Sequence, residues 1–324
     1  MEENQKKQTP ASGTNVITDS FKKAWAWYKE RRRARKEARK KPMTFKEQVV
    51  SWTKTIVGAI IVVMIINGLA IASFVVPTGS MQKTVMAGDF LFVNKFIYGP
   101  STPQVIPFLN IPLPFLRFPG LREPEQGDVI VFIYPGERNE LKPKNFEYYL
   151  KRCIAVAGDS LLIVNKRVFV NGAEFPLPPN AAAPLYPVNN APAPSPYGKG
   201  FTFDNYGPIR VPKEGDILQL NNNNIAEWKI FIEREGHKVS FDINTITIDG
   251  SATTEYKVQR NYCFGMGDNR DDSKDSRDWG FIPYENVVGT PIMVYWSWSP
   301  EIEMKNLGEK LKSIRWSRLG TFIR

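Results

Sequence analysis

The chain contains one histidine and two cysteines, and this scarcity limits the chemistry that its side chains can do. Two cysteines and one histidine cannot supply a zinc site of the usual ligand spacing. His237 lies in the polar stretch Arg-Glu-Gly-His-Lys-Val, where a solvated surface histidine is the ordinary outcome. If the chain uses a serine nucleophile, its base is therefore another residue type, and lysine is the established substitute.

A lysine can act as a base only where its surroundings lower its pKa. Free lysine titrates near ~10.4, so about three units must come from removing the amine from water. Lys151 lies in Tyr-Tyr-Leu-Lys-Arg-Cys-Ile-Ala-Val, with apolar residues on both sides, whereas most later lysines lie in polar runs or turns. The alternative is a lysine at a strand edge that points to solvent, and without further support it is the default.

Three other segments bear on this choice. Residues 77–81 read Pro-Thr-Gly-Ser-Met, and the glycine before Ser80 permits a tight turn and a close approach of a substrate backbone. Residues 127–132 read Gly-Asp-Val-Ile-Val-Phe. Residues 267–280 read Gly-Asp-Asn-Arg-Asp-Asp-Ser-Lys-Asp-Ser-Arg-Asp-Trp-Gly, which composition alone would assign to a polar loop.

Together these segments resemble the bacterial type I signal peptidases (leader peptidases), which remove signal peptides from exported preproteins with a Ser-Lys dyad. The likeness covers about residues 72–100, 126–160 and 258–298, and the 267–280 run is its most specific part. The resemblance implies that Ser80 is the nucleophile and Lys151 the general base. It also implies supporting roles: Thr78 and the Ser80 N–H in the oxyanion hole, Ser273 orienting the Lys151 amine, and Asp275 with Arg277 as a structural ion pair.

The family cleaves after small residues in an Ala-x-Ala pattern. The resemblance therefore implies an extended substrate strand paired with the enzyme's own strands, and an acyl-enzyme that needs no metal and no organic cofactor. The positions that match the substrate pockets are Phe74, Val76, Val85 and Leu150, and ordinary core packing is the alternative for each. The implied partners are signal peptides and the lipid bilayer. We expect a monomer that binds no nucleic acid.

The chain departs from the family pattern at two positions. The family usually has a proline three residues after the nucleophile, where this chain has Lys83, which loosens the turn and adds a charge. Ala157 stands where the family has Pro before Gly-Asp. Two alternatives to an active enzyme stay open: an inactive homologue that acts as a scaffold, and a single-pass membrane protein with a β-rich binding domain. The second does not account for Ser80, Lys151 and the 267–280 run occurring together.

An apolar segment precedes Ser80. Thr55–Val76 contains no charged residue, and a helix of this length spans about 33 Å, close to the ~30 Å of a bilayer's hydrocarbon core. We therefore predict a transmembrane helix over residues 51–76. A buried core helix and a cleavable signal peptide are weaker alternatives. Ser80 would then lie within ~14 Å of extended chain from Val76.

The positive charge before this segment sets the expected orientation. The formal net charge is +10, and the densest cationic run is Arg31–Lys41, which favours a membrane-flanking role over a nucleic-acid patch. By the positive-inside rule, a leader over residues 1–50 stays in the cytoplasm, and the catalytic domain lies on the outer face of the bacterial cytoplasmic membrane. Residues 1–20 read as disordered, and 21–50 as either a membrane-surface helix or a solvated leader.

The chain after Val76 predicts a mostly β fold, an antiparallel β-sheet protease domain. Alternating or short apolar runs predict strands at 90–93, 129–133, 161–164, 168–170, 243–248, 262–264 and 292–296, with a hairpin turn at 165–167. The β core would comprise residues 77–160 and 258–300. An accessory lobe over 161–257 interrupts it, rich in Pro, Ala and Asn over 173–214 and with a helix over 224–235.

Three smaller features complete the organisation. The tail over residues 301–324 is either solvated or a surface-lying helix. The Pro107–Pro119 loop either dips into the bilayer or folds on its own core, since its prolines exclude a helix. Cys153 and Cys263 permit one disulfide, but we expect two buried free thiols.

Overall fold

The computed structural model describes residues 23, 25–32, 44–100, 105–106, 111–112, 116–179, 181, 187, 191–196 and 198–323. The chain divides into two compact units, Met1–Ile61 and Val62–Arg324. Residues 1–20, most of the Arg31–Lys41 run and most of the Pro107–Pro119 loop lie outside the described residues, so the predictions made for them stay predictions.

Helix α2, Phe45–Leu69, is long and apolar. It follows a capping box in which the Thr44 N–H donates to the Glu47 carboxylate at 2.9 Å and the Glu47 N–H donates back to Thr44 Oγ1 at 3.4 Å. The part Phe45–Met64 has the length and composition to cross a membrane, and none of it is buried within the protein.

The end of this helix differs from our prediction. We expected helix as far as Val76, whereas the structure ends α2 at Leu69 and places Ile71–Val75 in strand β1. A short apolar run of β-branched and aromatic residues satisfies both patterns, so composition does not separate them. The decisive contact is the pairing of β1 with the later strand Asp89–Asn94.

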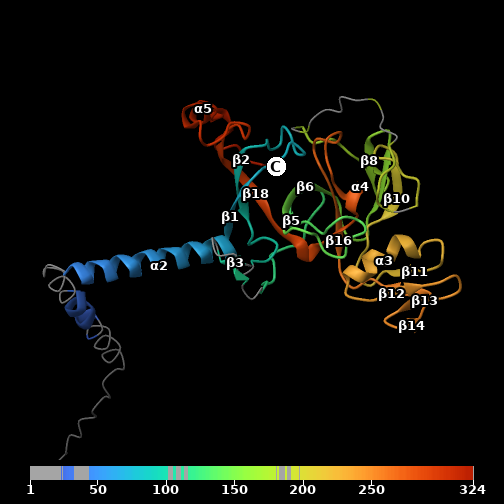
Figure 1. Ribbon diagram of the computed structural model, residues 1–324, viewed down its shortest axis with the longest axis horizontal. Helices are drawn as coiled ribbons and strands as arrows, with labels where there is room; N and C mark the ends of the chain where they lie inside the picture. Colours follow the sequence, from blue (N-terminus) through green and yellow to red (C-terminus); the bar gives the residue numbers. More distant parts are fainter. Residues whose placement is uncertain are drawn as a thin grey trace, which may run out of the picture. The chain divides into compact units, whose positions relative to one another are not determined.

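The main sheet is antiparallel and seven-stranded (Figure 1). Its strands, in spatial order, are β1 (Ile71–Val75), β2 (Asp89–Asn94), β18 (Val287–Ser297), β5 (Val129–Ile133), β6 (Tyr148–Ala155), β16 (Tyr262–Met266) and β17 (Ile282–Pro283). The sheet curls, because the ring of Phe74 on β1 meets that of Tyr148 on β6 with centroids 4.9 Å apart, although three strands separate β1 from β6 in the spatial order. The curl creates a hollow between these two strands.

Two apolar clusters fill the two sides of β6. One joins Leu150 to Val76, Leu91, Val131 and other residues of β1, β2, β5 and β18. The other places Tyr149 and Cys153 with Phe132, Cys263 and Trp279. Because successive side chains of a strand point to opposite faces, the strand that carries Lys151 is fixed from both sides.

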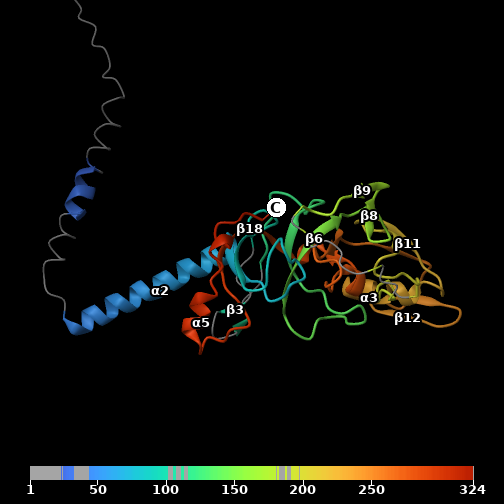
Figure 2. The ribbon, with the colours of Figure 1, turned by 90° about the horizontal axis from the view of Figure 1, so that it is seen from above.

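The segment predicted as an accessory lobe supplies a second sheet and several small elements. The second sheet has the order β10 (Tyr206–Arg210), β7 (Ser160–Val164), β8 (Arg167–Val170) and β9 (Ala173–Phe175). The other elements are helix α3 (Ile225–Arg234), the pair β11 (Ile217–Gln219) with β15 (Glu255–Lys257), and the set β12 (Val239–Phe241), β13 (Ile246–Ile248) and β14 (Ser251–Ala252). Figures 1 and 2 both show β8 and α3 beyond β6, away from β18. All belong to the unit Val62–Arg324.

Short elements complete the unit Val62–Arg324. These are β3 (Val105–Ile106), β4 (Ile111–Pro112), α4 (Ser276–Trp279), the 3-10 turns η1 (Tyr284–Asn286) and η2 (Trp316–Arg318), and α5 (Leu307–Lys312). The C-terminal segment is neither a free tail nor only a surface helix. The Val294 N–H on β18 donates to the Thr321 carbonyl at 2.9 Å, and Ile323 packs against the cluster that contains Leu150.

Most predicted strands are confirmed, namely 90–93, 129–133, 161–164, 168–170, 262–264 and 292–296. The helix predicted at 224–235 is α3, although the Asn224 side chain donates to the Gln219 carbonyl and does not cap the helix. The strand predicted at 243–248 is wrong in its first half. Residues 242–245 form a turn in which the Asp242 carboxylate accepts from the Asn244 and Thr245 N–H groups, so only Ile246–Ile248 pair. Cys153 and Cys263 are buried free thiols, as expected.

Candidate active site

Ser80 lies in the turn that follows β1, and the 267–280 loop holds that turn from its other side. The Asn269 N–H donates to the Ser80 carbonyl at 3.0 Å, and the Asn269 side chain donates to the Gly79 carbonyl at 3.1 Å. Gly267 allows this contact, because a Cβ there would stand 2.5 Å from the Ser80 carbonyl oxygen. The backbone around the Ser80 hydroxyl is therefore fixed by a segment far away in the sequence.

Lys151 reaches Ser80 directly. Its Nζ lies 2.6 Å from the Ser80 Oγ, and the residue is 3 % exposed. Burial lowers the pKa of Lys151 to about 8, against the opposing pull of the Asp275 carboxylate. A neutral amine that accepts the proton of a serine hydroxyl is thus accessible near neutral pH.

Thr78 stands beside the same hydroxyl. Its Oγ1 lies 3.5 Å from the Ser80 Oγ, at the long limit of a hydrogen bond. The role expected of Thr78, as an oxyanion-hole donor together with the Ser80 N–H, stays a prediction.

Ser273 does not make the contact expected of it. Its Oγ is buried and has no hydrogen-bond partner among the described residues, so the predicted bond to the Lys151 amine is absent from this structure. The hydroxyl lies instead against Gly267, where a Cβ would meet it at 2.2 Å.

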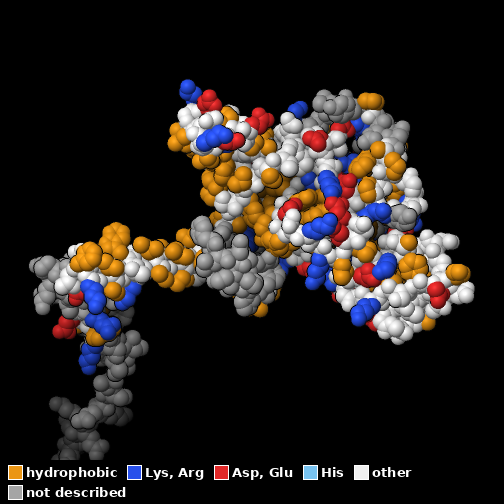
Figure 3. All heavy atoms as spheres, in the orientation of Figure 1, with side chains coloured by type: hydrophobic (Ala, Val, Ile, Leu, Met, Phe, Trp, Pro, Cys, Tyr) orange, Lys and Arg blue, Asp and Glu red, His pale blue; other side chains and the backbone are white. Residues whose placement is uncertain are grey.

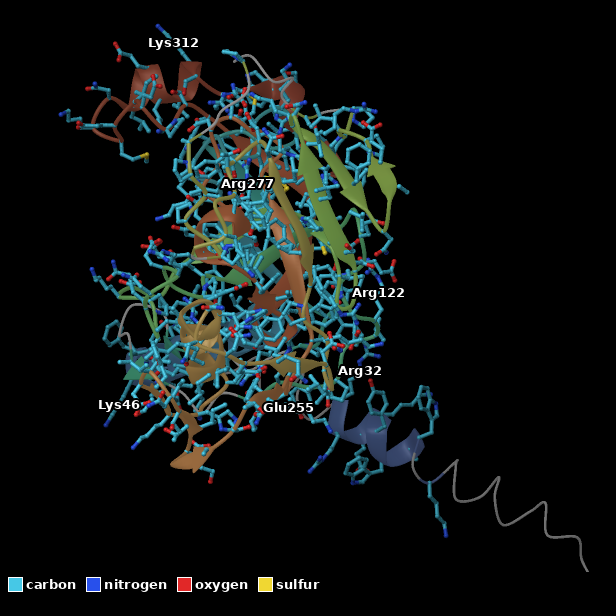
Figure 4. All side chains as sticks on the ribbon, turned by 90° about the vertical axis from the view of Figure 1, so that its right-hand side faces the viewer. Arg32, Lys46, Arg122, Glu255, Arg277 and Lys312 are labelled. Carbon is cyan, nitrogen blue, oxygen red and sulfur yellow. The ribbon has the colours of Figure 1, made fainter. Side chains whose placement is uncertain are left out.

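Asp275 and Arg277 form an ion pair of 2.8 Å, and each is at most 1 % exposed. Asp275 also begins α4 through a capping box with Asp278. Arg277 donates onward to the Phe203 carbonyl of the insertion at 3.0 Å and to the Arg270 carbonyl at 3.1 Å. Figure 4 shows Arg277 within the body of the unit Val62–Arg324. The pair thus ties the 267–280 loop to the inserted segment.

A second buried pair supports the site and was missed by the sequence analysis. Arg152, the neighbour of Lys151, binds Asp268 through two hydrogen bonds of 2.8 and 2.7 Å. Thr84 donates to the same carboxylate at 2.6 Å. Asp268 therefore joins β6, the 267–280 loop and the segment after Ser80. The only signal for it was the position of both charged residues inside the quoted motifs.

A cleft of about 550 Å³ opens beside Ser80 and Lys151. Of the four predicted pocket residues, Phe74, Val76 and Leu150 line this cleft. Val85 does not line it, because it is fully buried in the cluster beneath. The cleft is further lined by Val75, Pro77, Met81, Leu91, Val131, Glu147, Tyr148, Tyr149, Asp272 and Lys274.

Comparison with known proteins places these residues in a family. The family described as "Signal peptidase, peptidase S26" matches residues 49–296. The chain belongs to this family. It is 32 % identical to the signal peptidase I of Helicobacter pylori over 286 residues, which are 86 % of this chain and 94 % of that protein. It is 28 % identical to the signal peptidase I of Pseudomonas aeruginosa over 272 residues, 80 % of this chain and 76 % of that protein.

Among solved structures, a signal peptidase I from Enterococcus faecalis is similar, with 19 % identity and a TM-score of 0.24, over 52 % of this chain and 97 % of that one. Signal peptidases of this family remove signal peptides from exported proteins, and α2 is consistent with a membrane anchor.

Proposed function

We propose that this chain is a membrane-bound serine endopeptidase that cleaves preproteins after small residues, with Ser80 as nucleophile and Lys151 as general base. The observation that carries the proposal is the 2.6 Å separation of the Ser80 Oγ and the Lys151 Nζ, with Lys151 buried. None of the described residues forms a group of three or more His, Cys, Asp or Glu side chains that could hold a metal ion. The proposed chemistry needs none.

In the first half of the reaction, the neutral amine of Lys151 takes the proton of the Ser80 hydroxyl as Oγ attacks the substrate carbonyl. The Ser80 N–H and the Thr78 hydroxyl stabilise the oxyanion that forms. The Lys151 ammonium then gives its proton to the departing amine, which leaves with the mature protein. An ester between Ser80 and the signal peptide remains.

In the second half, Lys151 accepts a proton from water as that water attacks the ester carbonyl. The tetrahedral intermediate collapses, the Ser80 oxygen leaves, and the Lys151 ammonium returns the proton to it. Free enzyme and free signal peptide result, and every proton is accounted for by one amine.

The substrate would lie extended between two free strand edges. Within the described part of the chain, β1 is the outer strand of the main sheet, and β6 pairs with β16 only from Arg152 onward. The edge of Tyr148–Lys151 that faces away from β5 therefore has no strand partner there. Main-chain hydrogen bonds to such edges bind a peptide without regard to its side chains. The apolar lining by Phe74, Val76 and Leu150 supports selection of small residues such as Ala.

Two surface features support a location at a membrane. The first is α2, with the cationic leader before it. The second is the gathering of hydrophobic side chains over β1, β2 and β18 seen in Figure 3. Val75 on β1 and Phe92 on β2 are exposed. Two further exposed residues lie at β18, since Trp316 meets the ring of Trp296 and Phe322 pairs with Met293. Such a patch on a soluble domain marks an interaction surface. By the positive-inside rule the catalytic unit lies outside the cytoplasm.

Cleavage of a preprotein by the purified full chain in detergent tests the proposal. We expect Ser80→Ala and Lys151→Met each to lower kcat by at least about 10³-fold, because either change removes the acyl-enzyme route. Lys151→Arg should lower kcat by as much, since a guanidinium stays charged and cannot accept the serine proton. Exposed counterparts on the insertion, Ser251→Ala and Lys257→Met, serve as matched controls.

The pH profile gives a second readout of the same dyad. Because the Lys151 amine must be neutral to accept the proton, the rate should rise as pH increases through about 8, the pKa to which burial lowers it. Full activity in the Ser80 and Lys151 variants, or a profile flat between about pH 6 and 10, would remove the dyad from the mechanism.

A further inference from the structure

The cleft has two different faces, and β6 separates them. Tyr148 and Leu150 point toward β1, since Tyr148 meets the ring of Phe74 at 4.9 Å and Leu150 joins the cluster of Val76. Tyr149 points to the opposite side, where its ring lies 5.4 Å from that of Trp279. The first face is the apolar pocket already described. The second belongs to the 267–280 loop.

The second face carries charges at its margin. Glu147, Asp272 and Lys274 line the same cleft as Ser80, and we name these three residues the charged rim. The Lys274 ammonium forms an ion pair with Glu137, which partly neutralises it. The rim with Glu137 therefore holds three carboxylates and one ammonium, a net negative charge at neutral pH.

The rim is anchored in the fold. Glu137 belongs to the loop between β5 and β6, and Arg234 of α3 donates to three carbonyls of that loop, at 3.0 Å to Gly136, 2.5 Å to Glu137 and 3.0 Å to Glu140. Arg234 is itself half-buried in the insertion. The nearby Lys144 is paired with Glu140 at 3.7 Å. The backbone around Glu137, the ion-pair partner of Lys274, is thus held in place.

We propose that the charged rim selects the residue between the two small residues of the cleavage motif, and prefers Lys or Arg there over Glu or Asp. The inference rests on the proposed function. An extended peptide alternates its side chains between two faces, so when its first and third small residues enter the apolar pocket, the middle one projects toward the rim. A cation there meets a net negative field, and an anion meets repulsion.

Competition between matched substrates tests this proposal. The full chain in detergent is given preproteins that differ only in the motif, Ala-Lys-Ala, Ala-Gln-Ala and Ala-Glu-Ala, and relative kcat/KM values are measured by mass spectrometry. We expect the Lys substrate to exceed the Glu substrate about fivefold at low salt, with Gln between them. The ratio should shrink toward one at about 0.5 M salt, because the rim is exposed to screening.

Rim variants assign the effect to its residues. The pair Glu147→Gln with Asp272→Asn should bring the Lys-to-Glu ratio to within about twofold of one. Lys274→Met should raise the ratio further, because it leaves Glu137 unpaired. Glu174→Gln, in an exposed ion pair with Arg167 on the second sheet, is the matched control and should leave the ratio unchanged.

Binding separates this proposal from the catalytic one. Peptides with the same three motifs are titrated onto the Ser80→Ala chain, and Kd values are read by fluorescence anisotropy. A Lys-to-Glu preference that the rim variants abolish supports the rim even if no substrate is turned over, whereas absence of turnover in the unaltered chain defeats the proposed function. Two results would overturn the proposed role of the rim. One is equal Kd and kcat/KM values for the Lys and Glu motifs, and the other is a preference that survives Glu147→Gln with Asp272→Asn.

Discussion

Lys83 occupies a backbone conformation that a proline cannot adopt. Its φ is +77°, in the left-handed region, whereas the proline ring fixes φ near −65°. The family resemblance leads us to expect a proline at this position, three residues after Ser80, and that residue would require a different turn. Lys83 is exposed and its loss removes little packing. Lys83 therefore belongs to a turn that a proline at this position would not allow.

Substitution at this position tests that conclusion. Lys83→Pro should destabilise the protein by about 3 kcal/mol and lower activity, because the ring forces φ to change sign next to Ser80. Lys83→Gly should stay within about 1 kcal/mol of the original, since glycine tolerates positive φ but loses more backbone entropy on folding. Thermal unfolding of both variants in the same detergent decides; a Lys83→Pro protein as stable as the original would contradict the assigned backbone.

At the scale of elements, the second half of the 267–280 loop contains the buried ion pair of Asp275 and Arg277. Asp275 begins α4 and neutralises Arg277, which in turn holds carbonyls of Phe203 and Arg270. A buried pair of this kind contributes little net stability when intact, but loss of one partner leaves a buried charge without its counterion. Replacing one residue of the pair should therefore destabilise the loop that supports Ser80 more than replacing both residues does.

Asp275→Asn should lower the free energy of unfolding by about 3 kcal/mol, because it leaves the Arg277 guanidinium unpaired in the interior. The double variant Asp275→Asn with Arg277→Met should recover part of that loss, since both charges are gone. Chemical denaturation of the original chain, the single variants Asp275→Asn and Arg277→Met, and the double variant measures the difference. If the double variant is the less stable by the full sum of the single effects, the two side chains are not coupled and the account of the loop is wrong.

At the scale of the whole molecule, the unit that carries the dyad and the apolar helix serve different purposes. Ser80, Lys151 and the cleft lie wholly within Val62–Arg324. The Phe45–Met64 part of α2 is apolar, and none of it is buried within the protein. In a bilayer such a helix keeps its backbone groups paired internally, which makes it a stable anchor.

Charges in the middle of α2 should release the protein from membranes. A lysine at a bilayer centre costs about 3 kcal/mol, so Ile60→Lys with Val63→Lys should move most of the chain to the soluble fraction after carbonate extraction. Lys46→Gln, at the start of the same helix, is the control and should leave extraction unchanged. Retention of the double variant in the membrane would show that surfaces other than α2 hold it there.

The sequence by itself indicated the family and the residue types of the proposed dyad. The one histidine lies in a polar turn, so lysine was the expected base. The order and spacing of the segments around Ser80, Lys151 and residue 267 indicated the family. Strands such as Val129–Ile133 were also readable, because short β-branched runs between turn residues have few other outcomes.

Only the tertiary structure decided which of these residues meet. Ser80 and Lys151 stand 71 positions apart in the chain, and the curl of the sheet brings them to 2.6 Å. It also decided that Ile71–Val75 is a strand, that Val85 is core, that Ser273 Oγ lacks its expected partner and that Lys83 has positive φ. Local sequence records a residue's type and its neighbours along the chain. Pairing partners, burial and backbone handedness arise from contacts between distant segments, which no local pattern contains.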